Sequence, residues 1–151
     1  MTTDHGNMYA WCNLAQVPVG DHTWVTTYTP GSGEPNPLQG YYWPCYGDPR
    51  PVAKQIAKGR GGIDFAQMIA SPFDKSATAG IRYGVDGVCH QIANRLLRFS
   101  FGDDGKPIRV SSAKGYRMSV IVWGEYGERK NLDCRQKWDA IVNSYISVEK
   151  E

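Results

Sequence analysis

The sequence predicts an α+β fold in which a small antiparallel sheet packs against helices, within a single domain covering residues 1–151. A chain of 151 residues has the length of one compact domain. Its 41% of hydrophobic residues, with five Trp and nine Tyr, supply the apolar area that a packed core requires. Strand-like segments come first and most helical ones later, an order typical of α+β proteins rather than of alternating α/β folds.

The predicted strands begin the chain. Residues 8–19 mix aromatic and branched side chains and predict a strand followed by a turn. Residues 22–29 are dense in β-branched and aromatic side chains, which favour a second strand. Alternation along that strand places four side chains on one face: His22, Trp24, Thr26 and Tyr28. The Pro- and Gly-rich residues 30–39 predict a loop, and residues 40–46 a short aromatic strand.

Helices are expected next. Pro51 suits the first turn of a helix over 51–58, and a second short helix is expected over 63–70. The clearest amphipathic helix begins at Cys89, because apolar residues recur there at helical spacing. These residues are Cys89, Ile92, Ala93, Leu96 and Leu97.

The last third of the chain predicts a turn, a strand and a helix. The GDDG sequence of residues 102–105 is typical of a turn and lacks the spacing of a calcium-binding EF-hand loop. Residues 116–123 are apolar on both faces and predict a central strand. Residues 133–146 predict the closing helix.

Charge and hydropathy exclude several classes of partner. The net charge is only +2, and the basic residues form no stripe with interleaved aromatics, so no nucleic-acid partner is expected. No stretch approaches the ~20 apolar residues of a membrane span. The N-terminus lacks the basic start and apolar run of a signal peptide. We therefore expect a cytoplasmic protein, or one exported without a Sec-type signal peptide.

The cysteines predict neither a disulfide framework nor a metal site. They stand at positions 12, 45, 89 and 134, too few and too far apart for a framework of bridges. Structural zinc sites draw on ligand pairs about two to four residues apart, and the sequence has none. No metal or other cofactor is expected.

Cys89 is the candidate nucleophile. It falls in the first turn of its helix, where unpaired backbone N–H groups and the helix dipole favour a thiolate. A base must then come from three histidines. His90 points about 100° away from Cys89 on the same helix, and His5 lies in a terminal segment. His22 is therefore the expected base.

These two motifs carry a family resemblance. A strand beginning DHTWVTTY, followed by a helix beginning DGVCHQIANRLL, resembles the papain-like fold in its circularly permuted arrangement. The NlpC-type endopeptidases have the same two elements in the opposite order, whereas the lecithin retinol acyltransferase-like group places the histidine first, as this chain does. The likeness covers residues 21–97. It departs from the pattern at Val88, where these families often carry Asp or Asn.

The resemblance implies a set of site residues. A polar third residue would orient the imidazole of His22, and Gln39 is assigned that role, with Asn36 and Asp48 as alternatives. Tyr83 and Trp24 would line the substrate site, and the backbone N–H of Cys89 would contact the oxyanion.

The resemblance also implies a function. The chain would be a cysteine amidase or peptidase that attacks a peptide amide in a cell-wall peptide or a protein, with deamidation and acyl transfer as variants of one chemistry. The length suits a small effector or toxin, whose further partner would be an inhibitor or immunity protein.

The alternative is a non-enzymatic interaction domain. In that case Cys89 belongs to the core, and an aromatic surface made of Tyr41, Tyr42, Trp43 and Tyr46 makes the contacts. In both cases His90, Gln91 and Asn94 are expected on the polar side of the helix, as surface residues or as local hydrogen-bond partners.

Overall fold

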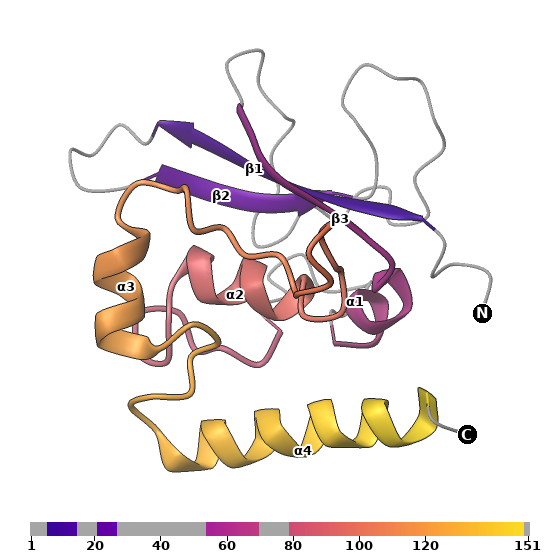
Figure 1. Cartoon of the computed structure of the whole chain (residues 1–151). Helices are drawn as coiled ribbons and strands as arrows, with labels where there is room; N and C mark the ends of the chain where they lie inside the picture. Colours follow the sequence, from indigo (N-terminus) through magenta and orange to yellow (C-terminus); the bar gives the residue numbers. More distant parts are fainter. Residues whose placement is uncertain (1–5, 15–20, 27–53, 70–78, 150–151) are drawn as a thin grey trace.

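The computed structural model describes residues 6–14, 21–26, 54–69 and 79–149 (Figure 1). Strands β1 (Asn7–Leu14), β2 (Asp21–Thr26) and β3 (Lys54–Arg60) form an antiparallel sheet in the order β2-β1-β3. The helices of the described part are α1 (Ile63–Ile69), α2 (Cys89–Leu96), α3 (Tyr116–Trp123) and α4 (Leu132–Glu149). The predicted α+β class, with a small antiparallel sheet beside helices, is confirmed at this level. The predicted loop over 30–39 and strand over 40–46 lie outside the described residues.

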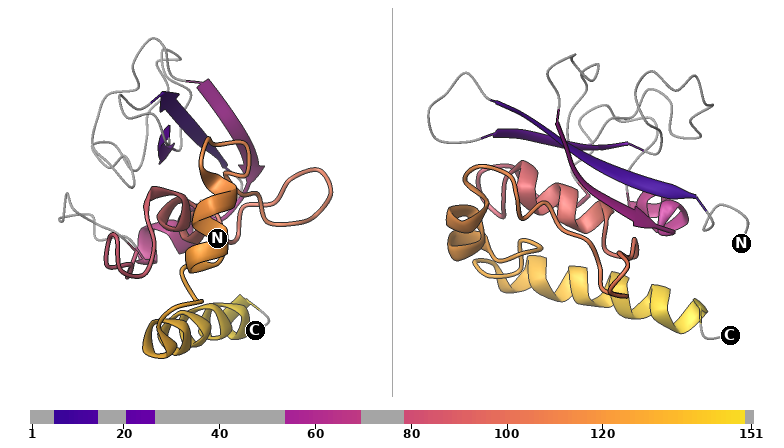
Figure 2. Two further views of the ribbon diagram at one scale, coloured as in Figure 1. Left: turned by 90° about the vertical axis from the view of Figure 1, so that its left-hand side faces the viewer. Right: turned by 45° about the horizontal axis from the view of Figure 1, so that its top comes forward.

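The elements form three layers (Figures 1 and 2). The sheet covers one side of α2, and α4 runs below the level of α1 and α2 on the far side from the sheet. Helix α3 stands at one end of this arrangement. Because α2 is enclosed between layers, all eight of its residues are buried.

The sheet packs on α2 through one of its two faces. Register pairs Ala10 of β1 with Val25 of β2, and both belong to a buried cluster with Ile92 and Leu96 of α2. Each buried side chain of this size contributes about 1.5–3 kcal/mol to the hydrophobic stabilisation. Alternation assigns the intervening residues to the other face of the sheet, where the Trp11 Nε1–H donates to Thr26 Oγ1 at 2.9 Å.

A second cluster joins α1 to α4. Phe65 of α1 meets Trp138 and Tyr145 of α4 edge to face, with ring centroids 5.9 and 5.0 Å apart. Val142, one turn after Trp138, completes the cluster. The predicted helix over 133–146 is confirmed as part of α4, and this aromatic contact holds it against the domain.

The prediction of a helix over 51–58 was wrong, because residues 54–60 form β3. The strand pairs with β1 from Asn7 to Cys12 through long-range hydrogen bonds that local propensity does not reveal. Gly59 has little room for a side chain, since a Cβ there would lie 2.9 Å from Ile108 Cδ1 and 3.1 Å from Ser100 Cβ. The close approach of these side chains to the strand explains the glycine better than a helix end does.

The prediction of a central strand over 116–123 was also wrong, because these residues form α3. Gly115 (φ 85°) and Gly124 (φ 83°) bracket the helix in conformations that glycine favours. The apolar run does not reflect burial on both faces, since Met118 and Ile121 are exposed. A short apolar run without clear periodicity is compatible with either element, and the flanking glycines were the usable signal.

Gly62 lies in the connection between β3 and α1, and substituting it tests how much close packing there contributes to stability. It has φ +83°, and a Cβ would lie 2.7 Å from the carbonyl carbon of Phe99 and 2.8 Å from Ser100 Oγ. We expect Gly62→Ala to lower the free energy of unfolding by about 2–4 kcal/mol, because left-handed backbone strain and a backbone clash add. Urea denaturation measures this.

The matched control is Gly105→Ala. Gly105 also has positive φ, at +75°, but nothing lies within 4 Å of an added Cβ. This variant should lose only the backbone term, about 1–2 kcal/mol. Equal losses in the two variants would show that the packing against Phe99 does not matter.

Candidate functional site

Cys89 is the first residue of α2, as the sequence predicts. Val88 before it is the extended N-cap residue, with φ −130°. Gly87 allows the side chain of Gln91 to lie close to the backbone before the helix, since a Cβ at position 87 would lie 2.7 Å from Gln91 Cβ. The thiol of Cys89 is 6% exposed, so it lies just beneath the surface at the start of the helix.

Backbone pairing fixes which end of the sheet lies next to Cys89. After α2, the N–H of Arg60 donates to the carbonyl of Phe101 at 2.9 Å, and Arg60 pairs with Asn7 at the beginning of β1. The C-terminal end of α2 therefore lies at the end of the sheet where β2 finishes, since Thr26 pairs with Tyr9. Cys89 lies toward the other end, where β2 begins (Figure 1).

Gln91 ties the start of α2 to α3. Its Oε1 accepts the Val88 N–H at 2.9 Å, which satisfies one backbone donor of the helix start. Its Nε2 donates to Ser119 Oγ at 3.0 Å and to the Gly124 carbonyl at 3.1 Å. The buried side chain of Gln91 therefore links α2 to α3 through hydrogen bonds.

The hydrogen bonds of Ser119 fix the proton on the imidazole of His90. The single hydroxyl proton of Ser119 is directed at the Tyr116 carbonyl, 2.8 Å away. The 2.9 Å contact between His90 Nδ1 and Ser119 Oγ must then use the Nδ1–H as donor. In the neutral ring this arrangement leaves the lone pair on Nε2. His90 packs edge to face on Tyr116, with centroids 5.7 Å apart.

Asn94 completes this buried polar cluster, one turn further along α2. Its Nδ2 donates to the Tyr116 hydroxyl at 3.0 Å and to the Glu125 carbonyl at 2.8 Å, while Oδ1 accepts the Val110 N–H at 3.0 Å. Burial raises the pKa of the Tyr116 hydroxyl, which keeps it protonated. Of the two expectations for His90, Gln91 and Asn94, exposure at the surface was wrong, because α3 and the segment after it cover that side of α2. The three side chains are hydrogen-bond partners, mostly of residues distant in the chain.

A rigid loop leads into Cys89. The carboxylate of Asp86 accepts three hydrogen bonds from Arg82, from its backbone N–H at 3.0 Å, Nε at 2.9 Å and Nη2 at 3.1 Å. The Gly84 N–H donates to the Gly87 carbonyl at 2.7 Å and closes the loop. Between these anchors Tyr83 and Val85 are 60% and 52% exposed. The loop therefore presents two large side chains to solvent just before α2.

Asp86 makes the stability of this loop dependent on pH. Hydrogen bonding to Arg82 holds the pKa of the Asp86 carboxyl below its usual value, although burial opposes the shift. A lowered pKa contributes stability above the unfolded-state value of about 3.9, and this contribution is lost as the pH falls through the folded-state pKa. We expect Asp86→Asn to cost about 1.5–3 kcal/mol near neutral pH, with the difference from wild type shrinking below about pH 4.

Urea denaturation at several pH values measures this effect. Asp139→Asn is the control, because Asp139 is an exposed carboxylate in a 3.9 Å ion pair with Arg135 and should contribute less than about 1 kcal/mol. A difference between wild type and Asp86→Asn that does not vary with pH would contradict the assignment.

The sequence-predicted site residues are placed as follows. Tyr83 belongs to the loop just before Cys89, so the structure brings these two near the start of α2. Trp24 is buried on the sheet face that does not pack on α2. His22 lies in β2 with its Cα paired to Asn13, and in the alternation of the strand position 22 belongs with 24 and 26. The side chain of His22 lies outside the described residues.

The remaining predicted site residues also lie outside the described part of the chain: Gln39, Asn36 and Asp48. Sequence reasoning missed Ser119 and Tyr116, which come from a segment predicted as a strand. The available signal was the set of three polar residues, His90, Gln91 and Asn94, on one side of an amphipathic helix. This set was assigned to the surface or to local hydrogen bonds because its partners stand more than twenty residues away in the chain.

Neither metal binding nor membrane crossing is indicated among the described residues. Over residues 6–14, 21–26, 54–69 and 79–149, no three His, Cys, Asp or Glu side chains gather as they would around a metal ion. No helix in those ranges combines the length and apolar character needed to cross a bilayer. Comparisons with protein-family models, curated protein sequences and solved structures gave no match.

Proposed function

We propose that this protein is a thiol-dependent amide hydrolase with Cys89 as its nucleophile, built on the permuted papain-like arrangement of a histidine strand followed by a cysteine helix. The observation that supports the proposal is the position of Cys89. Cys89 is the first residue of α2, toward the end of the sheet where β2 begins, and His22 is the second residue of β2. Strand alternation assigns position 22, with 24 and 26, to the sheet face away from α2, so the proposed dyad requires the imidazole to reach Cys89 past the start of the strand.

The electrostatics of this position require a partner for the thiol. The helix start favours a negative charge, worth about 0.3–1 kcal/mol in an exposed setting. Cys89 is also only 6% exposed, and a charge removed from water needs an opposite charge nearby to offset the cost of desolvation. An imidazolium close to the sulfur would decide the balance in favour of the thiolate, and His22 is the proposed source of that charge.

The reaction follows from an activated thiol. His22 removes the proton of Cys89, and the sulfur attacks the amide carbonyl carbon to form a tetrahedral oxyanion. The imidazolium then protonates the amide nitrogen, which leaves as an amine, or as ammonia when the substrate is a glutamine side chain. Water then attacks the carbonyl carbon of the remaining thioester and gives one proton to the imidazole. The C–S bond breaks to release the carboxylic acid, and the imidazolium returns the proton to the sulfur of Cys89. An attacking amine in place of water gives acyl transfer.

The substrate proposed is a peptide amide in a cell-wall peptide or a protein. The loop formed by residues 82–87 supports a peptide because it holds Tyr83 and Val85 exposed, next to the start of α2, on a backbone that Asp86 and Arg82 keep rigid. Exposed aromatic and branched side chains on a fixed loop can contact a substrate side chain with little loss of entropy.

Selective alkylation tests the proposal. Wild-type protein is treated with iodoacetamide at about pH 6, and the four cysteines are followed by peptide mass mapping. An activated Cys89 should react much faster than Cys12 and Cys134, which are similarly buried. Labelling of Cys89 at the same rate as these two, or more slowly, would overturn the proposal.

One observation favours the alternative of a non-enzymatic interaction domain with Cys89 in its core. The same low exposure of Cys89 is typical of unreactive cysteines. The alkylation experiment separates the two functions, because a core cysteine reacts only when the domain opens. Mild urea should then accelerate Cys89, Cys12 and Cys134 together.

A further inference from the structure

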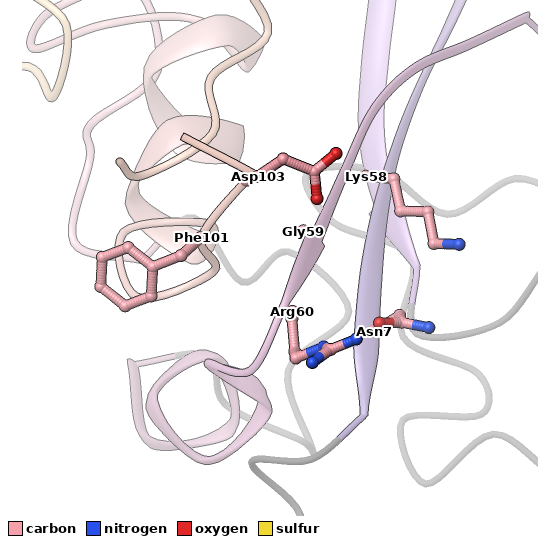
Figure 3. A pocket seen from close by; sticks show the side chains of 7 residues that line it. Asn7, Lys58, Gly59, Arg60, Phe101 and Asp103 are labelled. Carbon is pink, nitrogen blue, oxygen red and sulfur yellow. The ribbon is translucent and has the colours of Figure 1, made fainter. Parts of the chain in front are cut away.

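A groove lies along the outer edge of β3, at the opposite end of α2 from Cys89. It has a volume of about 590 Å³. Among the described residues, those that line it are Asn7, Lys58, Gly59, Arg60, Phe101, Gly102 and Asp103. Figure 3 shows Phe101 and Asp103 on one side of β3, and the side chains of Lys58 and Asn7 on the other.

The backbone N–H and C=O groups of Lys58 in β3 point into this groove. The Arg60 N–H donates to the Phe101 carbonyl at 2.9 Å, and the Phe101 N–H donates to the Arg60 carbonyl at 3.0 Å, so the peptide groups of Arg60 point away from β1. Successive residues of a strand direct these groups to opposite edges. Gly59 therefore faces β1, and Lys58 faces outward, in line with Phe101.

An added strand could pair with the outer edge of β3 next to the position where Phe101 pairs with Arg60. The isolated bridges of the described residues pair Arg60 with Phe101 and Phe101 with Pro107, and none reaches Lys58. An outward N–H and C=O at a sheet edge form a template for one more strand. The GDDG turn, closed by the Gly105 N–H on the Gly102 carbonyl at 3.0 Å, marks where the added strand would stop.

Charge selects the partner that such an edge accepts. Lys54, Lys58 and Arg60 are all exposed along β3, whereas the described lining of the groove contributes one carboxylate, that of Asp103. Pairing with a second copy of this chain would place these cations against one another, which disfavours self-association through this edge. A strand carrying carboxylates would instead place opposite charges across the pair.

On the two sides of β3, different kinds of side chain from the added strand would make favourable contacts. On the side of Lys58 and Asn7, acidic residues would meet the cation. On the other side lies Phe101, whose ring is 39% exposed and available for apolar contact. Because strand side chains alternate between faces, the matching sequence alternates acidic and apolar residues.

We propose that the β3 edge is a docking site for an extended segment of a partner protein in which acidic and apolar residues alternate, and that this segment adds as a strand beside Lys58. The site is separate from Cys89, and the proposal does not depend on the proposed hydrolase. Lysines on an edge strand also discourage indiscriminate pairing, and here the same charges make pairing selective for an acidic strand.

The probe is a fluorescein-labelled nine-residue peptide of alternating Glu and Val, titrated into the full chain and followed by fluorescence anisotropy. Lys58→Glu should weaken binding at least about tenfold, since it replaces an attraction by a repulsion. Lys130→Glu, which makes the same charge change at an exposed position between α3 and α4, should have little effect. A peptide with N-methyl groups at alternate amides keeps the charge but should lose binding.

Amide hydrogen exchange gives the direct signature of strand addition. The bound peptide should slow exchange of the Lys58 amide and leave the Gly59 amide, which already faces β1, unchanged. Equal effects of Lys58→Glu and Lys130→Glu, undiminished binding of the N-methylated peptide, or no saturable binding would each overturn the proposal. So would a wild-type dimer that Lys58→Glu dissociates, because a second copy would then occupy the edge.

Discussion

Replacing Cys89 by Ala is expected to remove amide hydrolysis almost completely, lowering the rate by at least about 10³-fold. The sulfur forms the bond to the carbonyl carbon in the proposed reaction, and no other side chain can replace it. The fold should survive, because the change removes one atom from a site that still has 6% exposure. The cost should be about 1 kcal/mol.

The measurement uses mass spectrometry on a panel of glutamine-containing peptides and cell-wall peptides, which detects both cleavage and deamidation. Cys12→Ala is the matched control, since Cys12 is also buried but lies in β1. It should keep the activity. A Cys89→Ala protein as active as Cys12→Ala would end the hydrolase proposal.

Arg95→Ala is expected to cause a large loss of stability, about 3–5 kcal/mol. The guanidinium is 3% exposed. Its Nε donates to the Tyr126 carbonyl at 2.7 Å, Nη1 to the Ala79 carbonyl at 2.9 Å and Nη2 to Cys134 Sγ at 3.3 Å. Truncation would leave buried carbonyls without a donor and open a cavity beside Trp138, whose ring centroid lies 4.6 Å from the guanidinium carbon.

Two controls separate this network from the general effect of removing an arginine. Arg98→Ala removes a guanidinium that stacks over Phe99 at 4.9 Å and is only half-buried. It should cost about 1 kcal/mol. Arg95→Lys keeps the charge but lacks the planar fork, so it should remain well below wild type in urea denaturation. A loss in Arg95→Ala no greater than in Arg98→Ala would contradict the structural role of the network.

The parts of the fold that the sequence could predict are those determined locally. Helix α2 was predicted because its apolar residues recur at helical spacing, and α4 because Trp138 and Val142 lie one turn apart. β3 could not be predicted in this way, because its backbone is extended by pairing with β1, more than forty residues earlier in the chain. α3 was mistaken for a strand because its apolar residues do not mark a buried face.

The candidate site likewise has residues that local sequence pattern predicts and residues that it does not. The position of Cys89 at the start of a helix follows from local pattern and is confirmed. The burial of His90 and Asn94 could not be foreseen, because their partners Ser119 and Tyr116 come from a helix that the sequence predicts as a strand. A charged residue near a helix end, such as Arg95, is ordinarily exposed to water. Its burial is favourable only because carbonyl groups of distant loops accept its hydrogen bonds.

The coupling of Cys89 to His22 is measured most directly by the pH dependence of Cys89 alkylation in wild type, His22→Ala and His90→Asn. The Asn side chain keeps a donor toward Ser119, so His90→Asn is the matched control. Wild type and His90→Asn should be alkylated at Cys89 much faster near pH 6 than His22→Ala, because only they keep the proposed base. Superimposable profiles in wild type and His22→Ala would contradict the role of His22.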